Sequence, residues 1–94
     1  NYTKIRLMFE KHIEYFEILL ANSKLRKQVM RKESFNMFHD LIMDFGINYK
    51  RLKADAFLYH CYCKYLRQSD KLIIYCCPML IHLYKRFLVK YNLL

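Results

Sequence analysis

The chain has very few residues that turn or break the backbone. Its 94 residues include one glycine, one proline and no tryptophan. Tight turns, hairpins and bulges draw on glycine and proline, so an all-β fold is disfavoured. One glycine also rules out the glycine-rich loops that hold phosphate groups in nucleotide-binding proteins. The sequence therefore predicts an all-α fold, a small bundle of four to five helices in a single domain spanning residues 1–94.

Acidic residues are the second shortage. Eight Asp and Glu stand against 17 Lys and Arg, which gives a formal net charge of +9. Hydrophobic residues make up 55% of the chain, with nine Tyr and seven Phe, more apolar material than one small core readily hides. The charge predicts a polyanionic partner, and the aromatic surplus predicts a protein partner or a second copy of the chain.

The four cysteines do not form a metal-binding pattern. Cys61 and Cys63 point about 200° apart on a helix, so neither zinc nor another cofactor is expected. Cys76 and Cys77 are adjacent, unlike the spaced cysteines of a small secreted disulfide scaffold, and an intracellular, reducing compartment is expected. If the two helices around residues 68–70 pack antiparallel, Cys63 and Cys76 approach each other, and a redox link between them is a hypothesis.

No constellation for catalysis is visible. Nucleophilic catalysis needs a Ser or Cys beside a base that a third group orients. The histidines His12, His39, His60 and His82 are scattered over the expected helices. Only His39 has a neighbouring acid, Asp40, which we expect to point elsewhere on the helix. We therefore expect a protein that binds rather than an enzyme.

Neither a targeting segment nor a membrane span is expected. The sequence begins at Asn1 rather than with a methionine, so we expect a fragment or a trimmed start. It shows no charged head followed by an apolar run and a small-residue cleavage site. The longest uncharged run, residues 72–84, is shorter than the ~20 residues that cross a bilayer and contains Pro78. Membrane contact is a minor alternative, through the basic amphipathic residues 85–91.

Hydrophobic periodicity predicts a first helix over residues 4–21. Its inward residues are Ile5, Met8, Phe9, Ile13, Phe16, Leu19 and Leu20. Residues 25–45 form either one bent helix or two, with Ser34 as the cap of the second. Gly46 is expected to end this element in the left-handed conformation, with Ile47 packing back.

Two further elements are expected in the C-terminal half. Asn48 caps a helix that reaches about Gln68, with Tyr49, Leu52, Ala56, Tyr59, Cys63 and Leu66 facing inward. Ser69 and Asp70 restart the chain. The last element, from Lys71 to about Tyr91, is apolar nearly all round through Tyr84, which is typical of a central helix, and Pro78 kinks it or begins a new one.

The basic residues cluster without intervening acids. The first cluster is Lys24, Arg26, Lys27, Arg31 and Lys32, of which Lys24, Lys27 and Arg31 share a helical stripe. The C-terminal half adds Lys50, Arg51, Lys53, Lys85 and Arg86. Tyrosines that can stack on unpaired bases interleave with the cations of this half: Tyr49, Tyr59, Tyr62, Tyr65, Tyr84 and Tyr91. This pattern predicts a module that docks on RNA, DNA or a nucleoprotein assembly.

Three alternatives remain open. A turn at Gly46 is compatible with a helix-turn-helix whose second helix begins at Tyr49. The chain also fits a small helical subunit that fills a groove in a larger protein assembly. A third alternative is the dimerising, ligand-holding core of a transcription regulator, because residues 8–20 resemble the helical C-terminal regions of TetR-type regulators; the later residues do not extend that resemblance.

Overall fold

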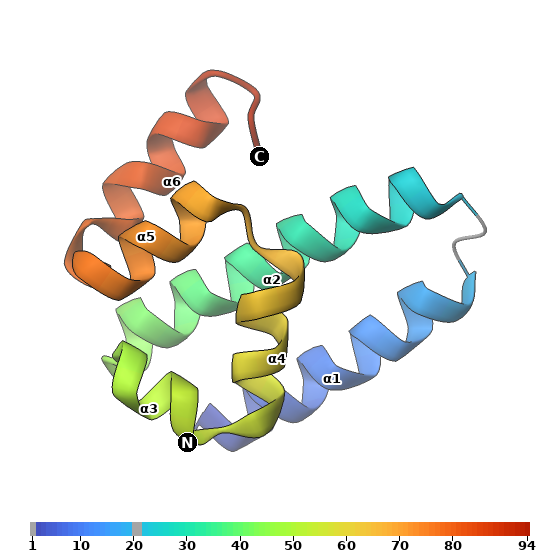
Figure 1. Cartoon of the computed structure of the whole chain (residues 1–94), viewed down its shortest axis with the longest axis horizontal. Helices are drawn as coiled ribbons and strands as arrows, with labels where there is room; N and C mark the ends of the chain where they lie inside the picture. The colour runs from blue at the N-terminus through green and yellow to red at the C-terminus, as the bar shows by residue number, and fades with distance from the viewer. Residues whose placement is uncertain (1, 20–21) are drawn as a thin grey trace.

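The computed structural model describes residues 2–19 and 22–94, and within them the chain is all-α, without strands (Figure 1). The elements are α1 Tyr2–Leu19, α2 Ser23–Phe45, α3 Tyr49–Ala54, α4 Ala56–Tyr65, α5 Gln68–Cys76, the 3-10 turn η1 Pro78–Leu80 and α6 Ile81–Lys90. The predicted all-α fold is confirmed. The predicted count of four to five helices is not, because two of the expected helices are broken and the described residues form six.

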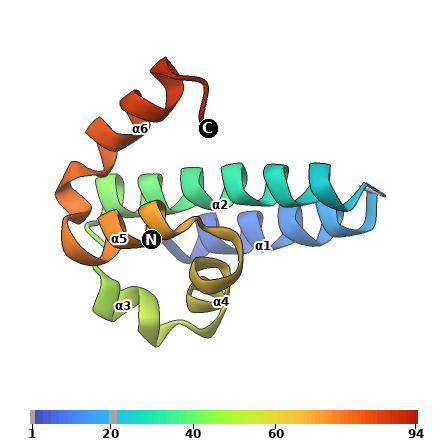
Figure 2. The same ribbon diagram turned by 45° about the horizontal axis from the view of Figure 1, so that its top comes forward.

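α2 is the central element of the fold. It is one continuous helix, and the Asn22 side chain caps it by accepting hydrogen bonds from the backbone N–H groups two and three residues on. Ser34 is fully buried in mid-helix, so the prediction of a second cap there is wrong. Phe35, Phe38 and Leu41 are also fully buried, and α1, α4 and α6 pack around this helix (Figures 1 and 2).

α1 runs antiparallel to α2 and covers one side of it (Figure 2). Phe9 and Ile13 are buried and Ile5 and Phe16 pack against the core, as the periodicity predicts. Met8 was expected to face inward but is exposed. The predicted helix end at residues 20–21 lies outside the described residues, as does the side chain of residue 19.

Gly46 ends α2 as the sequence predicts. Its φ of 62° and ψ of 30° are left-handed, and its N–H donates to the carbonyl of Ile42 at 3.0 Å. The N–H of Ile47 donates to the carbonyl of Leu41 at 3.4 Å, and the Ile47 side chain is buried. Asn48 then caps α3, which confirms the second predicted boundary. Three residues, 46–48, therefore separate α2 from α3.

The helix expected to run from Asn48 to about Gln68 is broken at Asp55. Asp55 Oδ1 accepts hydrogen bonds from the backbone N–H groups of Phe57 (3.0 Å) and Leu58 (3.2 Å), so it caps α4. Its other oxygen, Oδ2, lies 2.7 Å from Nε of Arg6 on α1. An ion pair across the fold thus stabilises an extended residue where periodicity predicts continuous helix.

The break changes which residues of this segment face the core. Leu58, Cys61 and Tyr62 are buried, whereas Ala56 and Cys63, both predicted to face inward, are exposed. The helical register restarts at residue 56 because the backbone of residue 55 is extended, and the inward positions shift with it.

The C-terminal segment is also divided, at Cys77 and Pro78. Cys77 has φ −141° and ψ 64°, Pro78 begins η1, and the helices on either side are bent by 118°. Ile74, Ile81 and Leu88 are the buried hydrophobic residues of this segment, and most of residues 72–84 is exposed. The prediction of a central helix here is therefore wrong, and α2 takes that place.

A buried carboxylate joins the parts of the C-terminal half. Asp70 is 1% exposed; its Oδ2 accepts hydrogen bonds from the backbone N–H of Arg67 (3.1 Å) and from its Nε (3.3 Å). Its Oδ1 accepts the hydroxyl of Tyr84 on α6 at 2.6 Å. Arg67 Nη1 donates to the carbonyl of Leu93 at 3.1 Å, so one carboxylate ties α5, α6 and the C-terminal tail together.

Replacing Gly46 with alanine should destabilise the fold by about 1 kcal/mol, because a Cβ disfavours the left-handed backbone. No atom lies within 4 Å of the position of that Cβ, so the cost comes from the backbone alone. Asparagine, which tolerates this conformation, should cost less. Urea unfolding of the three proteins measures the difference, and an alanine variant as stable as the parent would contradict the assignment.

The Tyr84→Phe substitution should destabilise the protein by about 1.5–3 kcal/mol, because it removes a hydrogen bond to a buried carboxylate. Burial and the bond to Asp70 raise the pKa of Tyr84. The folded state therefore keeps the phenol proton after the unfolded state loses it, and this stabilisation declines as pH rises above about 10. Thermal unfolding between neutral and alkaline pH measures both effects.

Tyr15, whose side chain is exposed on α1, supplies the matched control. The Tyr15→Phe variant should keep the parent's stability and its alkaline profile. If Tyr84→Phe and Tyr15→Phe unfold alike, the Asp70 network does not stabilise the C-terminal half.

Candidate nucleic-acid interface

The ten residues predicted to bind nucleic acid fall on three helices. α2 carries Lys24, Arg26, Lys27, Arg31 and Lys32, α3 carries Lys50, Arg51 and Lys53, and α6 carries Lys85 and Arg86. A helix rises about 1.5 Å per residue, so residue 24 lies about 30 Å from the end of α2 that leads into α3. The structure therefore does not gather the ten residues into one patch.

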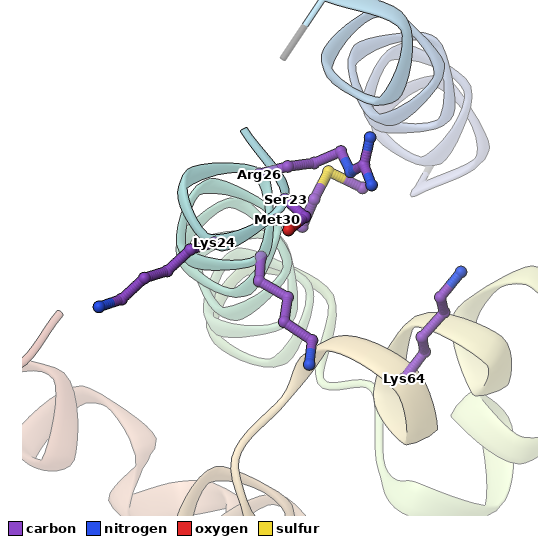
Figure 3. Close-up of a pocket in the computed structure, with 6 residues that line it drawn as sticks. Ser23, Lys24, Arg26, Met30 and Lys64 are labelled. Atoms are coloured by element: carbon purple, nitrogen blue, oxygen red, sulfur yellow. The ribbon is translucent and has the colours of Figure 1, made fainter. Parts of the chain in front are cut away.

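Three of the α2 cations face a cation of α4 across an open hollow. Lys24, Lys27, Arg31 and Lys64 line a hollow of about 250 Å³ together with Gln28 and Tyr65. An adjoining hollow of about 450 Å³ shares Lys24, Lys27 and Lys64 and adds Ser23, Arg26 and Met30 (Figure 3). Figure 3 shows Lys64 rising from α4 opposite α2. We call Lys24, Lys27, Arg31 and Lys64 the cationic groove.

The charges of the cationic groove are not neutralised within the described part of the chain. No ion pair among the described residues involves Lys24, Lys27, Arg31 or Lys64. The Nε atom of Arg31 is buried and has no hydrogen-bond partner among the described residues. Four uncompensated cations around one hollow produce a positive potential that attracts anions.

A tyrosine that lines the groove is hydrogen-bonded to an acid of α1. The Tyr65 hydroxyl donates to Oε1 of Glu17 on α1 at 2.7 Å, and the Lys64 ammonium lies 5.4 Å from the Tyr65 ring centroid. Burial and the Glu17 carboxylate raise the pKa of Tyr65, which favours the protonated phenol that donates this hydrogen bond. Glu17 is thus engaged by a hydroxyl and leaves the groove cations unpaired.

The remaining α2 cations flank the groove. Arg26 is half-buried and directed toward α1 (Figure 3). Lys32 lines a separate hollow of about 350 Å³ together with Arg31 and residues 92–94 of the C-terminal tail. Positive charge therefore extends from the groove around α2 toward the tail.

Lys64 is the residue that the site prediction omitted. The sequence predicts that Lys64 points outward from the helix after Asn48, and no neighbouring residue relates it to the cluster of residues 24–32. Its place opposite Arg31 depends on how α4 packs on α2, which in turn depends on the break at Asp55. The omission therefore comes from tertiary packing.

The predicted α3 cations lie on a short surface helix. Lys50, Arg51 and Lys53 are exposed, and Leu52 anchors the helix in the core. α3 has six residues, so it covers less than two turns before the break at Asp55. This length does not provide the long recognition helix that a helix-turn-helix inserts into the major groove.

Several tyrosines proposed to stack on bases contact one another instead. Tyr49 lies 5.5 Å from Tyr62 and 4.7 Å from Tyr75 between ring centroids, and Tyr59 stacks on Tyr62 at 6.3 Å. Burial raises the pKa of Tyr62 to about 12, and its hydroxyl donates to the carbonyl of Lys71 at 2.9 Å. These rings stabilise the packing between α3, α4 and α5.

Two histidines expected to be isolated are paired. His39 Nε2 lies 3.1 Å from His82 Nδ1, and His39 Nδ1 lies 3.1 Å from Oδ1 of Asp40. The prediction that Asp40 points elsewhere is therefore wrong, and the pair joins α2 to α6. No three His, Cys, Asp or Glu side chains of residues 2–19 and 22–94 come close enough together to hold a metal ion.

All four cysteines are free thiols. Cys61 is buried, and burial raises the pKa of its thiol to about 12. Cys63, Cys76 and Cys77 are exposed. The proposed link between Cys63 and Cys76 is not formed in this structure.

None of the described helices is by itself both long and apolar enough to cross a bilayer. α5 together with Pro78–Lys90 meets the length and composition requirement as a pair bent by 118°.

No protein-family model, curated protein or solved structure matches the chain. The assignment of function therefore depends on the geometry and charge of the described residues.

Brief treatment of the native protein with iodoacetamide at slightly alkaline pH should modify Cys63, Cys76 and Cys77 and spare Cys61. The thiolate is the reacting form, and Cys61 is both buried and kept protonated. Mass spectrometry of the peptides identifies the modified sites, and unfolding in urea should make all four react. Rapid modification of Cys61 in the native protein would contradict the packing of α4.

Proposed function

We propose that the chain is a non-enzymatic module that binds RNA or DNA, alone or within a nucleoprotein assembly, through the cationic groove. One observation carries the proposal: four cations from two helices line one hollow and none of them is paired with an acid. A phosphodiester backbone supplies the anionic oxygens that such a groove lacks.

The composition of the groove favours contact with phosphates over contact with base edges. Lysine binds phosphate as a point charge, whereas the Arg31 guanidinium can donate two parallel hydrogen bonds to phosphate oxygens. Phosphate contacts orient a nucleic acid without reading its sequence. We therefore propose binding that depends strongly on salt and weakly on sequence.

The other predicted cations have secondary roles in this proposal. Arg26 and Lys32 border the groove and extend its reach along α2. The lysines and arginines of α3 and α6 strengthen the long-range attraction that comes from the net charge of +9. We propose a reducing intracellular compartment, because Cys63, Cys76 and Cys77 are exposed free thiols. The proposal includes no metal ion or cofactor.

The triple variant Lys27→Ala, Arg31→Ala, Lys64→Ala tests the groove. Binding releases fewer counterions from the nucleic acid when three phosphate contacts are lost, so the slope of log affinity against log salt should flatten by about 2–3. Affinity for a single-stranded RNA and for a DNA duplex should fall roughly tenfold or more, as expected when several phosphate contacts are lost. Fluorescence anisotropy between about 50 and 200 mM salt measures both quantities.

The matched control carries the same change in charge outside the groove: Lys11→Ala, Lys50→Ala, Lys53→Ala. All three side chains are exposed, so the control should keep the circular dichroism of the parent, against which the fold of the groove variant is checked. Equal losses of affinity in the two variants would show that only the net charge matters, and would contradict the role of the groove. A parent protein that binds neither nucleic acid at low salt would overturn the proposal as a whole.

A further inference from the structure

α6 presents a second apolar face, which the described residues leave about half exposed. Leu83 and Phe87 on α6, with Leu80 at its N-cap and Tyr91 at its C-cap, are spaced three, four and four residues apart, so they lie within about 80° of one another around the helix axis. We call these four residues the α6 stripe. Each is between 47% and 60% exposed. The rings of Phe87 and Tyr91 are packed together, with centroids 4.8 Å apart, so the stripe has an ordered end.

The α6 stripe is distinct from the face that attaches α6 to the core. Ile81 and Leu88 are buried, and they lie about 100° away from the stripe around the axis. Tyr84, between the two faces, packs against Phe35 of α2 with ring centroids 5.7 Å apart. Figure 2 shows α6 at the margin of the molecule, with the other helices on one side of it. When a helix has two apolar faces, one packs against the core of its own protein and the second is available to contact another surface.

The charge beside the α6 stripe is of one sign. Arg86 and Lys90 are exposed, lie one turn apart and border the stripe. The Lys90 ammonium lies 5.6 Å from the centroid of the Tyr91 ring. After Asp70 the sequence contains no acidic residue. A complementary surface must therefore carry both an apolar ridge and acidic side chains.

We infer that the α6 stripe is the docking site for an amphipathic helix of another protein, with acidic residues beside its apolar ridge. Three- and four-residue spacing in a single row is the pattern of helix-to-helix packing, in which flanking charges select the partner. Helices that lie in a membrane interface carry their basic residues on the face opposite the apolar one, whereas Arg86 and Lys90 lie directly beside the stripe. A second copy of this chain would place Arg86 and Lys90 against the same cations, which disfavours self-association.

The inference is tested with a synthetic amphipathic helix of about 20 residues, long enough to cover the ~15 Å of α6. Its leucines follow three- and four-residue spacing, and glutamates flank them; a second peptide has lysines in place of the glutamates. Fluorescence polarisation should show that the acidic peptide binds at least tenfold more tightly than the basic one. The Leu83→Gln, Phe87→Gln variant should lose this binding.

The Leu72→Gln, Val89→Gln variant is the matched control. These side chains are 61% and 56% exposed, close to the 60% and 51% of Leu83 and Phe87, but they lie off the stripe. This control should bind the acidic peptide like the parent. The Arg86→Gln, Lys90→Gln variant should bind it more weakly and with less dependence on salt.

Four outcomes of the experiments without lipid would overturn the inference. They are failure of the parent to bind the acidic peptide, equal binding of the two peptides, equal losses in the two apolar variants, and dimerisation through the stripe seen by light scattering. Stripe-dependent binding to phosphatidylserine vesicles without a preference for the acidic peptide would assign the surface to a membrane and overturn it as well. The cationic-groove variant should bind the peptide like the parent, so the result is separate from nucleic-acid binding.

Discussion

The C-terminal half of the protein depends on the burial of the Asp70 carboxylate. A buried charge is costly unless it is paired and hydrogen-bonded, and Asp70 meets both conditions through Arg67 and Tyr84. The carboxylate thereby holds α6 against the start of α5, and the ring of Tyr84 in turn contacts Phe35 in the core. The outward direction of the α6 stripe follows from this attachment.

The scarcity of acids and the way in which they are used together shape the surface. Asp55 and Asp70 are engaged by arginines of the same chain, Glu17 by a tyrosine and Asp40 by a histidine. Half of the eight acidic residues thus take part in contacts that position helices. Lysines and arginines far outnumber the remaining acidic residues, and the cationic groove brings four of these unpaired cations together.

Local features of the sequence predicted the helical content and several of its boundaries. Gly46 and Asn48 are recognisable because their effects depend on the few residues around them, and the stripe of residues 24, 27 and 31 is a property of one helix. The break at Asp55 was missed because a single aspartate cap does not interrupt the apolar periodicity, and its ion pair with Arg6, 49 residues away in the sequence, is not visible from the neighbouring residues. Lys64 was likewise not predicted to belong to the groove, because only the packing of α4 on α2 places it opposite the cations of α2. Residues 72–84 were assigned to the centre from apolar content alone, and the bend at Pro78 turns most of them outward.

The central position of α2 has a consequence for how the chain folds. α1 and α2 are neighbours in the sequence, so their antiparallel pairing closes a short loop and can form early. The pair formed by His39 and His82 spans 43 residues, and the bond between Tyr65 and Glu17 spans 48. During synthesis, the face of α2 that α6 covers stays open to solvent until residues 81–90 have left the ribosome, and folding of this face must wait for them.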